Sequence, residues 1–427
     1  MRLAVFTSMY PAQTGTFFER DMRALLASGV ELDIFAIYPL DASFWQYSLG
    51  LLGEPGMSRE RVHHLGFWES LLPAARMILR RPGTVLRDMA ATLASAARHG
   101  PAAFAKTAYV IPKALAWAER HGERFDHVLG YWGNYAGTCA YVFHRAARSA
   151  APFSLWLHAG VDLYRTPVYL RQKLRYADNV ITCCDFNRTY IRERFSEPVL
   201  ARAGGVHVCH HGLDLADFAY QPEGRPAGHV IAVGRLAAHK GFDDLLSAIH
   251  LLSSRGCDLT VELVGDGPER HALAALAARL HLEDRVQFRG WLPFHGARDA
   301  MARATVLVHP SDGLGDGLPN VIREAMALGT PVIASDVAGI PDALGDGCGV
   351  LVPPQNPAAL ADRIATLLAD EGARRRIAEQ ARRRVEERYD VWQNGASLAE
   401  LLKHSRRRME TRRMAAMTPA PVTPDDV

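Results

Sequence analysis

Two cations lie close together in the C-terminal half of the chain, where a predicted strand gives way to a helix. In VGRLAAHKGFDDLL (233–246) the strand ends at Arg235, and Lys240 precedes the helix that begins near Phe242. A helix N-terminus presents free amides and the positive end of its dipole, and arginine adds a bidentate pair of donors. The segment predicts a diphosphate site. The competing interpretation is two solvated charges beside a glycine N-cap.

A carboxylate follows in a second strand–loop–helix segment, SDGLGDGLPNVIREAMALGTPVIAS (311–335). Asp316 lies in its glycine-rich loop, and Glu324 lies eight residues further on, in a helix predicted over 319–328. Glu324 could bind a ribose diol, and Gly317 would let a sugar approach the backbone because glycine has no Cβ. The alternative is a capped helix with an ordinary glutamate.

A third turn, VGDGPER (264–270), joins a strand to a helix through a Gly-x-Gly sequence that includes Gly265. It lacks the third glycine of the dinucleotide fingerprint, and the loop after the first predicted strand, SMYPAQTG, has one glycine. These departures argue against an NAD-dependent oxidoreductase, the rival class with similar elements.

The elements around these residues alternate between short apolar runs and amphipathic helical stretches, which is typical of doubly wound α/β proteins. Strands are predicted in the N-terminal half at 2–7, 31–37, 127–132, 153–158 and 179–183. The C-terminal half begins a new series at 229–235, with later strands in LTVELVG, VQFRG, TVLVHP and PVIAS. Ligands of such sheets bind beyond the carboxyl ends of the strands, where Arg235 lies.

The chain of 427 residues is long enough for two domains. A Gly- and Pro-rich stretch at 211–228 predicts a linker, so that 1–210 would form an acceptor domain and 211–388 a donor domain, both Rossmann-like. A last helix over about 389–404 is predicted to pack back on the N-terminal domain. The basic and then proline-rich residues 405–427 are predicted to be disordered.

Composition and charge limit the partners and the cellular location that we expect of the protein. A net charge of +3 argues neither for nor against nucleic acid, and we expect no nucleic-acid partner. The six cysteines form no Cys-x-x-Cys pair, as expected of reduced thiols. The first apolar run, in MRLAVFT, is too short for a signal peptide, and we expect a cytoplasmic protein. Residues 61–120 carry nine Lys or Arg against three acids. Two interpretations stay open there: peripheral contact with an anionic membrane or lipid-linked acceptor, and a solvated arginine-rich face.

The three C-terminal motifs, in this order and spacing, resemble the donor-binding half of the retaining family 4 glycosyltransferases, which have the GT-B fold. The N-terminal half resembles the same family in three segments: YPAQTGTFFERDMRALLASGVELDIFAI, LHAGVDLY and VCHHGLDLADF. The similarity covers about residues 1–390. It implies an α/β protein with two facing Rossmann-like domains and a central cleft.

The resemblance also implies roles for individual residues. Arg235 and Lys240 would neutralise the donor diphosphate, and Glu324 would bind the ribose. Asp316 matches the first acid of the family's Glu-x7-Glu motif, which contacts the transferred sugar, and His158 would lie in the cleft against the sugar or the acceptor. The remaining implied donor-binding positions are Gly15, Gly265, Leu292, Gly317, Leu318, Pro319 and Asn320.

Three positions depart from the family pattern: Asp316 stands where glutamate is usual, Ala159 follows the histidine, and His211 replaces an asparagine. The expected enzyme moves a hexose with retention from a UDP- or GDP-sugar to a hydroxyl of a glycan, lipid-linked or small-molecule acceptor in cell-surface polysaccharide biosynthesis. Because no Asp-x-Asp occurs, we expect no metal and no other cofactor. The alternatives are a sucrose- or trehalose-forming enzyme on the same fold and a non-catalytic nucleotide-sugar-binding protein.

Overall fold

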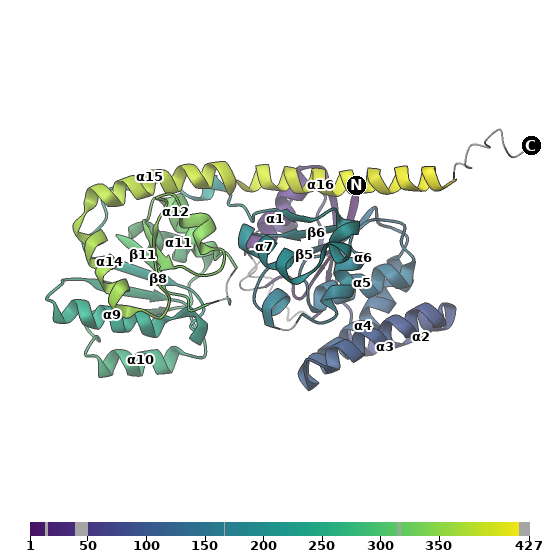
Figure 1. Cartoon of the computed structure of the whole chain (residues 1–427), viewed down its shortest axis with the longest axis horizontal. Coiled ribbons are helices and arrows are strands. Elements are labelled where there is room, and N and C mark those ends of the chain that lie inside the picture. Colours follow the sequence, from purple (N-terminus) through teal and green to yellow (C-terminus); the bar gives the residue numbers. More distant parts are fainter. Residues whose placement is uncertain (13–15, 39–49, 166, 314, 316, 418–427) are drawn as a thin grey trace, which may run out of the picture. The chain divides into compact units, whose positions relative to one another are not determined.

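A computed structural model describes residues 1–12, 16–38, 50–165, 167–313, 315 and 317–417 (Figure 1). The chain forms two compact units. Unit 1 comprises Met1–Thr182, Ile191–Cys209 and Gly395–Val427, and unit 2 comprises Cys183–Tyr190 and His210–Asn394. The boundary between Cys209 and His210 lies one residue from the boundary predicted after residue 210.

Unit 1 contains a parallel sheet in the order β3-β2-β1-β4-β5-β6-β7. Its strands are β1 Arg2–Thr7, β2 Glu31–Ala36, β3 Val62–His63, β4 His127–Gly130, β5 Phe153–Leu157, β6 Asn179–Thr182 and β7 Val206–Val208. The helices that carry unit 1 residues are α1 Thr16–Ala27, α2 Phe67–Arg80, α3 Pro82–Ala97, α4 Pro101–His121, α5 Tyr135–Ala147, α6 Leu170–Tyr176, α7 Asp185–Arg194, α8 Glu197–Leu200 and α16 Val391–Met417.

Unit 2 contains a second parallel sheet, in the order β10-β9-β8-β11-β12-β13. Its strands are β8 His229–Val233, β9 Thr260–Val264, β10 Val286–Gly290, β11 Val306–His309, β12 Val332–Ser335 and β13 Val350–Val352. Its helices are α9 Phe242–Ser254, α10 Arg270–Arg279, α11 Phe294–Arg303, α12 Asn320–Leu328, α13 Ile340–Leu344, α14 Pro357–Ala369 and α15 Glu371–Arg388. One apolar cluster lies under α9, α10 and α14, and a second lies under α11, α12, α13 and α15 (Figure 1).

The two parallel sheets with interleaved helices confirm the predicted α/β class. The longer strands begin and end within a few residues of their predicted positions, because strands buried on both faces are continuous apolar runs. Prediction failed for the short strands β3, β7 and β13 and for the helices between residues 67 and 121. Over the described part of the chain, no helix is both long and apolar enough to cross a bilayer.

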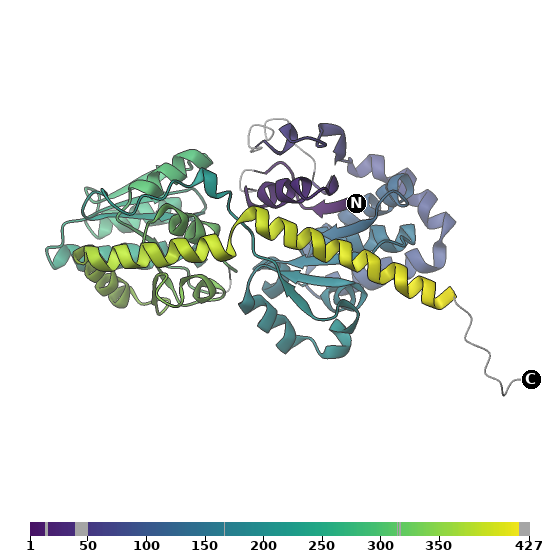
Figure 2. The same ribbon diagram turned by 90° about the horizontal axis from the view of Figure 1, so that it is seen from above.

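The last helix corrects the prediction of a disordered tail over 405–427. α16 continues to Met417 and runs across unit 1 in both views (Figures 1 and 2). Leu398 and Leu402 lie in the core of unit 1, and Ser405 is buried with its hydroxyl donating to Asn179 Oδ1 at 2.8 Å. Arg406 pairs with Asp126 at 2.8 Å. The basic residues extend the helix because they find acceptors on unit 1. Residues 418–427 lie outside the described residues.

Buried histidines tie several elements of unit 1 together. His144 of α5 is 2% exposed, and its ring nitrogens lie 2.8 Å from the Tyr176 hydroxyl and 2.7 Å from the Ala151 carbonyl oxygen. His127 of β4 is fully buried, 2.7 Å from Ser154 Oγ. Burial lowers the pKa of His144 to about 4 and that of His127 to about 3. Both rings are therefore neutral in the folded protein at neutral pH.

Acid should therefore destabilise unit 1 below pH 6.5. The unfolded chain gains a proton at each of these histidines near pH 6.5, whereas the folded chain does not until about pH 4, so stability is complete above pH 6.5 and falls as the pH drops. We expect His144→Gln, which preserves one donor and one acceptor, to reduce the pH dependence of the unfolding free energy by about 1.4 kcal/mol per pH unit in this range. Urea unfolding followed by tryptophan fluorescence measures it. The control is His271→Gln, at an exposed position; an unchanged slope in His144→Gln would contradict the assignment.

The loops at the carboxyl edge of the unit 2 sheet pack backbone against backbone. A Cβ at Gly265 would lie 1.9 Å from the Gly234 carbonyl oxygen, and one at Gly267 would lie 2.3 Å from that of Leu236. Gly265 also has φ +137°, a conformation that other residues rarely adopt. The loops after β8 and β9 therefore approach to a distance that only glycine permits.

Gly265→Ala should lower the unfolding free energy by about 3 kcal/mol, because it combines a backbone clash with an unfavourable φ. Gly256→Ala is the matched control: Gly256 has φ +75° but open space around it, so that we expect a cost of about 1 kcal/mol from conformation alone. Chemical denaturation of both variants measures the difference. Equal losses would show that the close approach contributes nothing.

Candidate functional site

The two predicted phosphate-binding cations of unit 2 lie where the strand order reverses. The chain leaves β8 for β9 on one side, and β11 pairs with β8 on the other. Arg235 follows Gly234 after the end of β8 and is exposed, and Lys240 ends the short 3-10 helix Ala238–Lys240 that precedes α9. Such a switch point opens a crevice between the loops of neighbouring strands. The fold therefore places both cations at the edge where an open α/β sheet binds ligands.

The loop carrying Lys240 is held against the loop after β11. The His239 carbonyl oxygen accepts hydrogen bonds from the Ser311 hydroxyl at 3.0 Å and from the Asp312 amide at 3.1 Å. Gly241, at φ +65°, leaves no room for a Cβ beside the Pro310 carbonyl oxygen, which would lie 2.0 Å away. These contacts bring the cation loop and the glycine-rich loop together, although the two are about 70 residues apart in sequence.

Glu324 lies in the second turn of α12, on a helix that is almost wholly buried. The residue is 9% exposed. Its neighbour Arg323 is 1% exposed and donates to the His211 carbonyl oxygen and to Asn320 Oδ1, and its guanidinium lies 5.5 Å from the Tyr389 ring centroid. Arg323 fixes the start of α12 from inside. This role was not predicted from the sequence, because an arginine beside a glutamate in a helix resembles an ordinary surface pair.

The other predicted donor-binding residues divide into backbone and side-chain contributors. The Leu318 side chain belongs to the apolar core, and Pro319 is the N-cap of α12, so each offers the site its backbone alone. The Gly317 carbonyl oxygen accepts from the Gly339 amide at 2.9 Å. Gly265 packs on Gly234 as described above, and Leu292 is half-buried against the core after β10.

Two predicted residues, Gly15 and Asp316, lie outside the described residues.

The positive charges near the N-terminus of α9 are partly balanced by carboxylates. Asp243 and Asp244 occupy the first turn of α9, and burial, reinforced by the charges of Asp243 and Asp312, raises the pKa of Asp244. This helix N-terminus already faces carboxylates. Arg235, Lys240 and the N-terminus of α12 therefore have to supply most of the attraction for an anion.

His158, the predicted catalytic residue of unit 1, ends β5 in a box of aromatic rings. Its ring centroid lies 4.2 Å from that of Trp132 and 4.9 Å from that of Tyr131, and Phe17 of α1 lies 6.0 Å away. The His158 side chain is 7% exposed. The ring is thus held at the carboxyl edge of the unit 1 sheet by apolar surfaces from three elements.

Asp162 lies against both the backbone amide and the ring of His158. Its Oδ2 accepts from the His158 amide at 3.3 Å and lies 3.6 Å from His158 Nδ1, and its Oδ1 accepts from the Asn134 amide at 2.9 Å. Lys173 is fully buried nearby and donates from Nζ to the Gly133 and Asn134 carbonyl oxygens and to Thr138 Oγ1. Burial lowers the pKa of Lys173 to about 7, against the opposing charge of Asp162.

Asp162 connects the loop after β4 with the end of β5, and Lys173 connects α6 with the loop after β4. Asp162 stands four residues after the histidine in the LHAGVDLY segment, a spacing visible in the sequence. Lys173 could not be identified from sequence spacing in this way, because RQKLRY has the composition of a solvated basic helix. Throughout the described residues, no group of three or more His, Cys, Asp or Glu side chains could hold a metal ion.

Known proteins resemble the chain in both sequence and structure. Residues 227–370 match the family model for glycosyl transferases group 1. The Escherichia coli protein WcaL, named for colanic acid biosynthesis, is 33% identical over 208 residues, which are 46% of this chain and 51% of WcaL. The chain thus spans about half the length of the first curated relatives it matches. The amylovoran biosynthesis glycosyltransferase AmsK of Erwinia amylovora is 25% identical over 94% of this chain and 99% of its own.

The solved structure of Anabaena HepE in complex with UDP-glucose aligns with 95% of this chain and 100% of its own, with a TM-score of 0.66 and 20% identity. At this identity the likeness concerns the fold. The family match covers the segment that carries Arg235, Lys240 and Glu324. The segment 227–370 is therefore similar to the glycosyl transferases group 1, and the chain has the GT-B fold of two Rossmann-like units.

Proposed function

We propose that this protein is a retaining glycosyltransferase that moves a hexose from a UDP- or GDP-sugar to a hydroxyl group of a glycan, lipid-linked or small-molecule acceptor in polysaccharide biosynthesis. The observation that carries the proposal is the placement of Arg235, Lys240 and Glu324 around the switch point of unit 2, within the segment that matches the family. WcaL and AmsK, named for colanic acid and amylovoran biosynthesis, support the polysaccharide setting, and the HepE complex supports a UDP-sugar.

In the proposed reaction, the bond between the anomeric carbon and the diphosphate oxygen breaks, and the acceptor oxygen bonds to the same face of the sugar. The acceptor proton passes to the departing diphosphate. Negative charge grows on the diphosphate as positive charge grows on the sugar, and fixed cations at Arg235 and Lys240 stabilise that charge without reorganisation. The same cations and the N-terminus of α12 serve here in place of a divalent metal.

Glu324 has a different task in this proposal, because it orients the nucleoside. Its carboxylate would accept hydrogen bonds from the two ribose hydroxyls, and the rigid, buried α12 would hold it in place. In unit 1, His158 would contact the sugar or the acceptor, with Asp162 and Trp132 beside its ring.

Lys240→Ala and Glu324→Ala should each reduce kcat/KM for sugar transfer at least about tenfold, equivalent to about 1.4 kcal/mol of transition-state stabilisation. Release of the nucleoside diphosphate measures turnover. The matched control is Arg279→Ala, which removes an exposed cation from α10. Wild-type turnover in either site variant would rule out this site, provided that the melting temperatures stay within a few degrees of wild type.

The donor nucleotide should reveal itself by stabilising the protein. We expect one of UDP, GDP and ADP to raise the melting temperature, since a ligand at a hundred times its Kd adds about 2.7 kcal/mol to the folded state. The rise should shrink in Lys240→Ala and persist in Arg279→Ala. If none of the three stabilises the wild-type protein, the nucleotide site is wrong. Binding without turnover on any glycan, lipid-linked or soluble sugar acceptor would favour a non-catalytic sugar-nucleotide-binding protein.

A further inference from the structure

The solvent face of α2 is more apolar than the face that packs inward. Its exposed residues include Trp68, Leu71, Leu72 and Leu79, spaced so that they lie along one side of the helix. Trp68 is 81% exposed and Leu79 is 80% exposed. The inward face carries Ser70, Pro73, Ala74 and Met77, which are mostly smaller. A helix that only covered a core would have the opposite pattern.

Exposed apolar residues are concentrated around this helix. Nine large apolar side chains are exposed among the described residues, and six of them lie on α2, α3 and α4. These six are Trp68, Leu71, Leu72, Leu79, Leu86 and Phe104. Both α2 and α3 pack against α4. A patch of this kind marks an interaction surface.

Positive charge surrounds the apolar side chains. The cations Arg76, Arg80, Arg87, Arg98 and Lys106 are exposed on or next to these helices. The acids do not balance them: Asp88 is buried and bound by Arg145 at 2.7 Å, which leaves Glu69 as the exposed acid of α2 and α3. Arginine stems can lie along an apolar surface while their guanidinium groups reach outward to anions.

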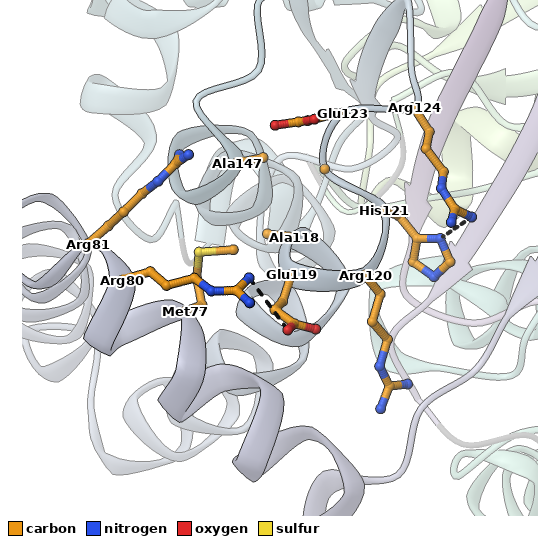
Figure 3. Close-up of a pocket in the computed structure, with 11 residues that line it drawn as sticks. Met77, Arg80, Arg81, Ala118, Glu119, Arg120, His121, Glu123, Arg124 and Ala147 are labelled. Carbon is orange, nitrogen blue, oxygen red and sulfur yellow. Dashed lines mark hydrogen bonds and ion pairs between the residues drawn. The ribbon is translucent and has the colours of Figure 1, made fainter.

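The C-terminal end of α2 adds further cations. There a pocket of about 340 Å³ is lined by Arg80, Arg81, Arg120 and Arg124, together with two glutamates (Figure 3). Arg80 pairs with Glu119 at 3.6 Å, and Arg81 donates to the Ala146 carbonyl oxygen at 2.7 Å. Burial lowers the pKa of His121, which also lines the pocket, to about 4, so this ring adds no charge at neutral pH. The pocket keeps a surplus of two positive charges beside the apolar stripe.

We propose that the outward surface of α2 and α3, the docking face, binds the surface of a bilayer that contains anionic phospholipids. It is defined by Trp68, Leu71, Leu72, Leu79 and Leu86 and by the cations Arg76, Arg80 and Arg87. The apolar side chains enter the acyl boundary, and Trp68 lies at the level of the headgroups, whose phosphates bind the arginines. A second copy of the chain is a poorer occupant, because it would place the same cations opposite one another.

Vesicle flotation of the full chain tests the docking face. We expect the protein to float with vesicles of phosphatidylglycerol and phosphatidylcholine and not with phosphatidylcholine alone. The triple variant Trp68→Ser, Leu72→Ser, Leu79→Ser should lose at least about tenfold in partition coefficient, since each substitution removes a large apolar side chain. Arg76→Glu with Arg87→Glu should lose about fivefold or more for each charge reversed, with a smaller loss at about 1 M salt than at about 0.1 M.

Control variants distinguish binding through the docking face from nonspecific binding by exposed aromatic or cationic side chains elsewhere. Trp392→Ser removes an exposed aromatic ring on α16, and Arg363→Glu reverses an exposed cation on α14; both should bind vesicles like the wild type. All substituted positions of the docking face are exposed, so the melting temperature should hardly change. Lys240→Ala should also bind vesicles normally, so that failure of the proposed enzyme function and failure of the docking face are distinguishable.

Three results would overturn the proposal. The first is that the wild-type protein binds no anionic vesicle. The second is that binding survives both the apolar and the charge variants. The third is a concentration-dependent dimer, seen by light scattering, that the triple variant abolishes while vesicle binding stays unchanged; this result would assign the face to a second copy of the chain.

Discussion

The close approach of backbone loops at the carboxyl edge of the unit 2 sheet is the constraint on which the candidate donor site depends. Parallel strands bring their carboxyl ends to one edge, but the loops after β8, β9 and β11 interlock there because Gly265, Gly267 and Gly241 lack a Cβ. The interlocked loops hold the Arg235 and Lys240 backbones in one place. A site for a developing charge is effective when its dipoles are fixed in advance, and backbone packing provides that rigidity here.

Buried polar groups do the corresponding work in unit 1. Asp162 accepts hydrogen bonds from backbone amides of two loops, and Lys173 donates hydrogen bonds to carbonyl oxygens of one of these loops. Such groups are costly to bury unless they are satisfied. The hydrogen bonds that satisfy these groups go to backbone atoms of the segments that carry Trp132 and His158. The same bonds therefore hold the aromatic rings around His158 in place. In unit 2, Arg323 has the same relation to the start of α12.

The helices α2 and α3 follow a different rule. Elsewhere most large apolar side chains point inward and assemble the cores, whereas here tryptophan and leucine point outward among arginines. Folding alone does not favour that arrangement, because each exposed apolar group remains hydrated. The donor site and the docking face therefore have opposite physical characters, one a rigid polar edge and the other an apolar surface that lacks a partner within its own unit.

The sequence by itself determined the α/β class, most strand positions of both sheets and the candidate donor residues Arg235, Lys240 and Glu324. These features are local: a buried parallel strand is an apolar run, and a cation at the end of a strand needs a few neighbouring residues to be recognised. Only the tertiary structure decided what depends on distant partners. Asn179 and Asp126 order the basic end of α16, and Gly133 and Asn134 give Lys173 its role. The solvent face of α2 likewise could be identified only in the tertiary structure, where α4 packs against the other side of the helix. An amphipathic pattern identifies an apolar stripe, but which stripe is buried depends on what packs against the helix.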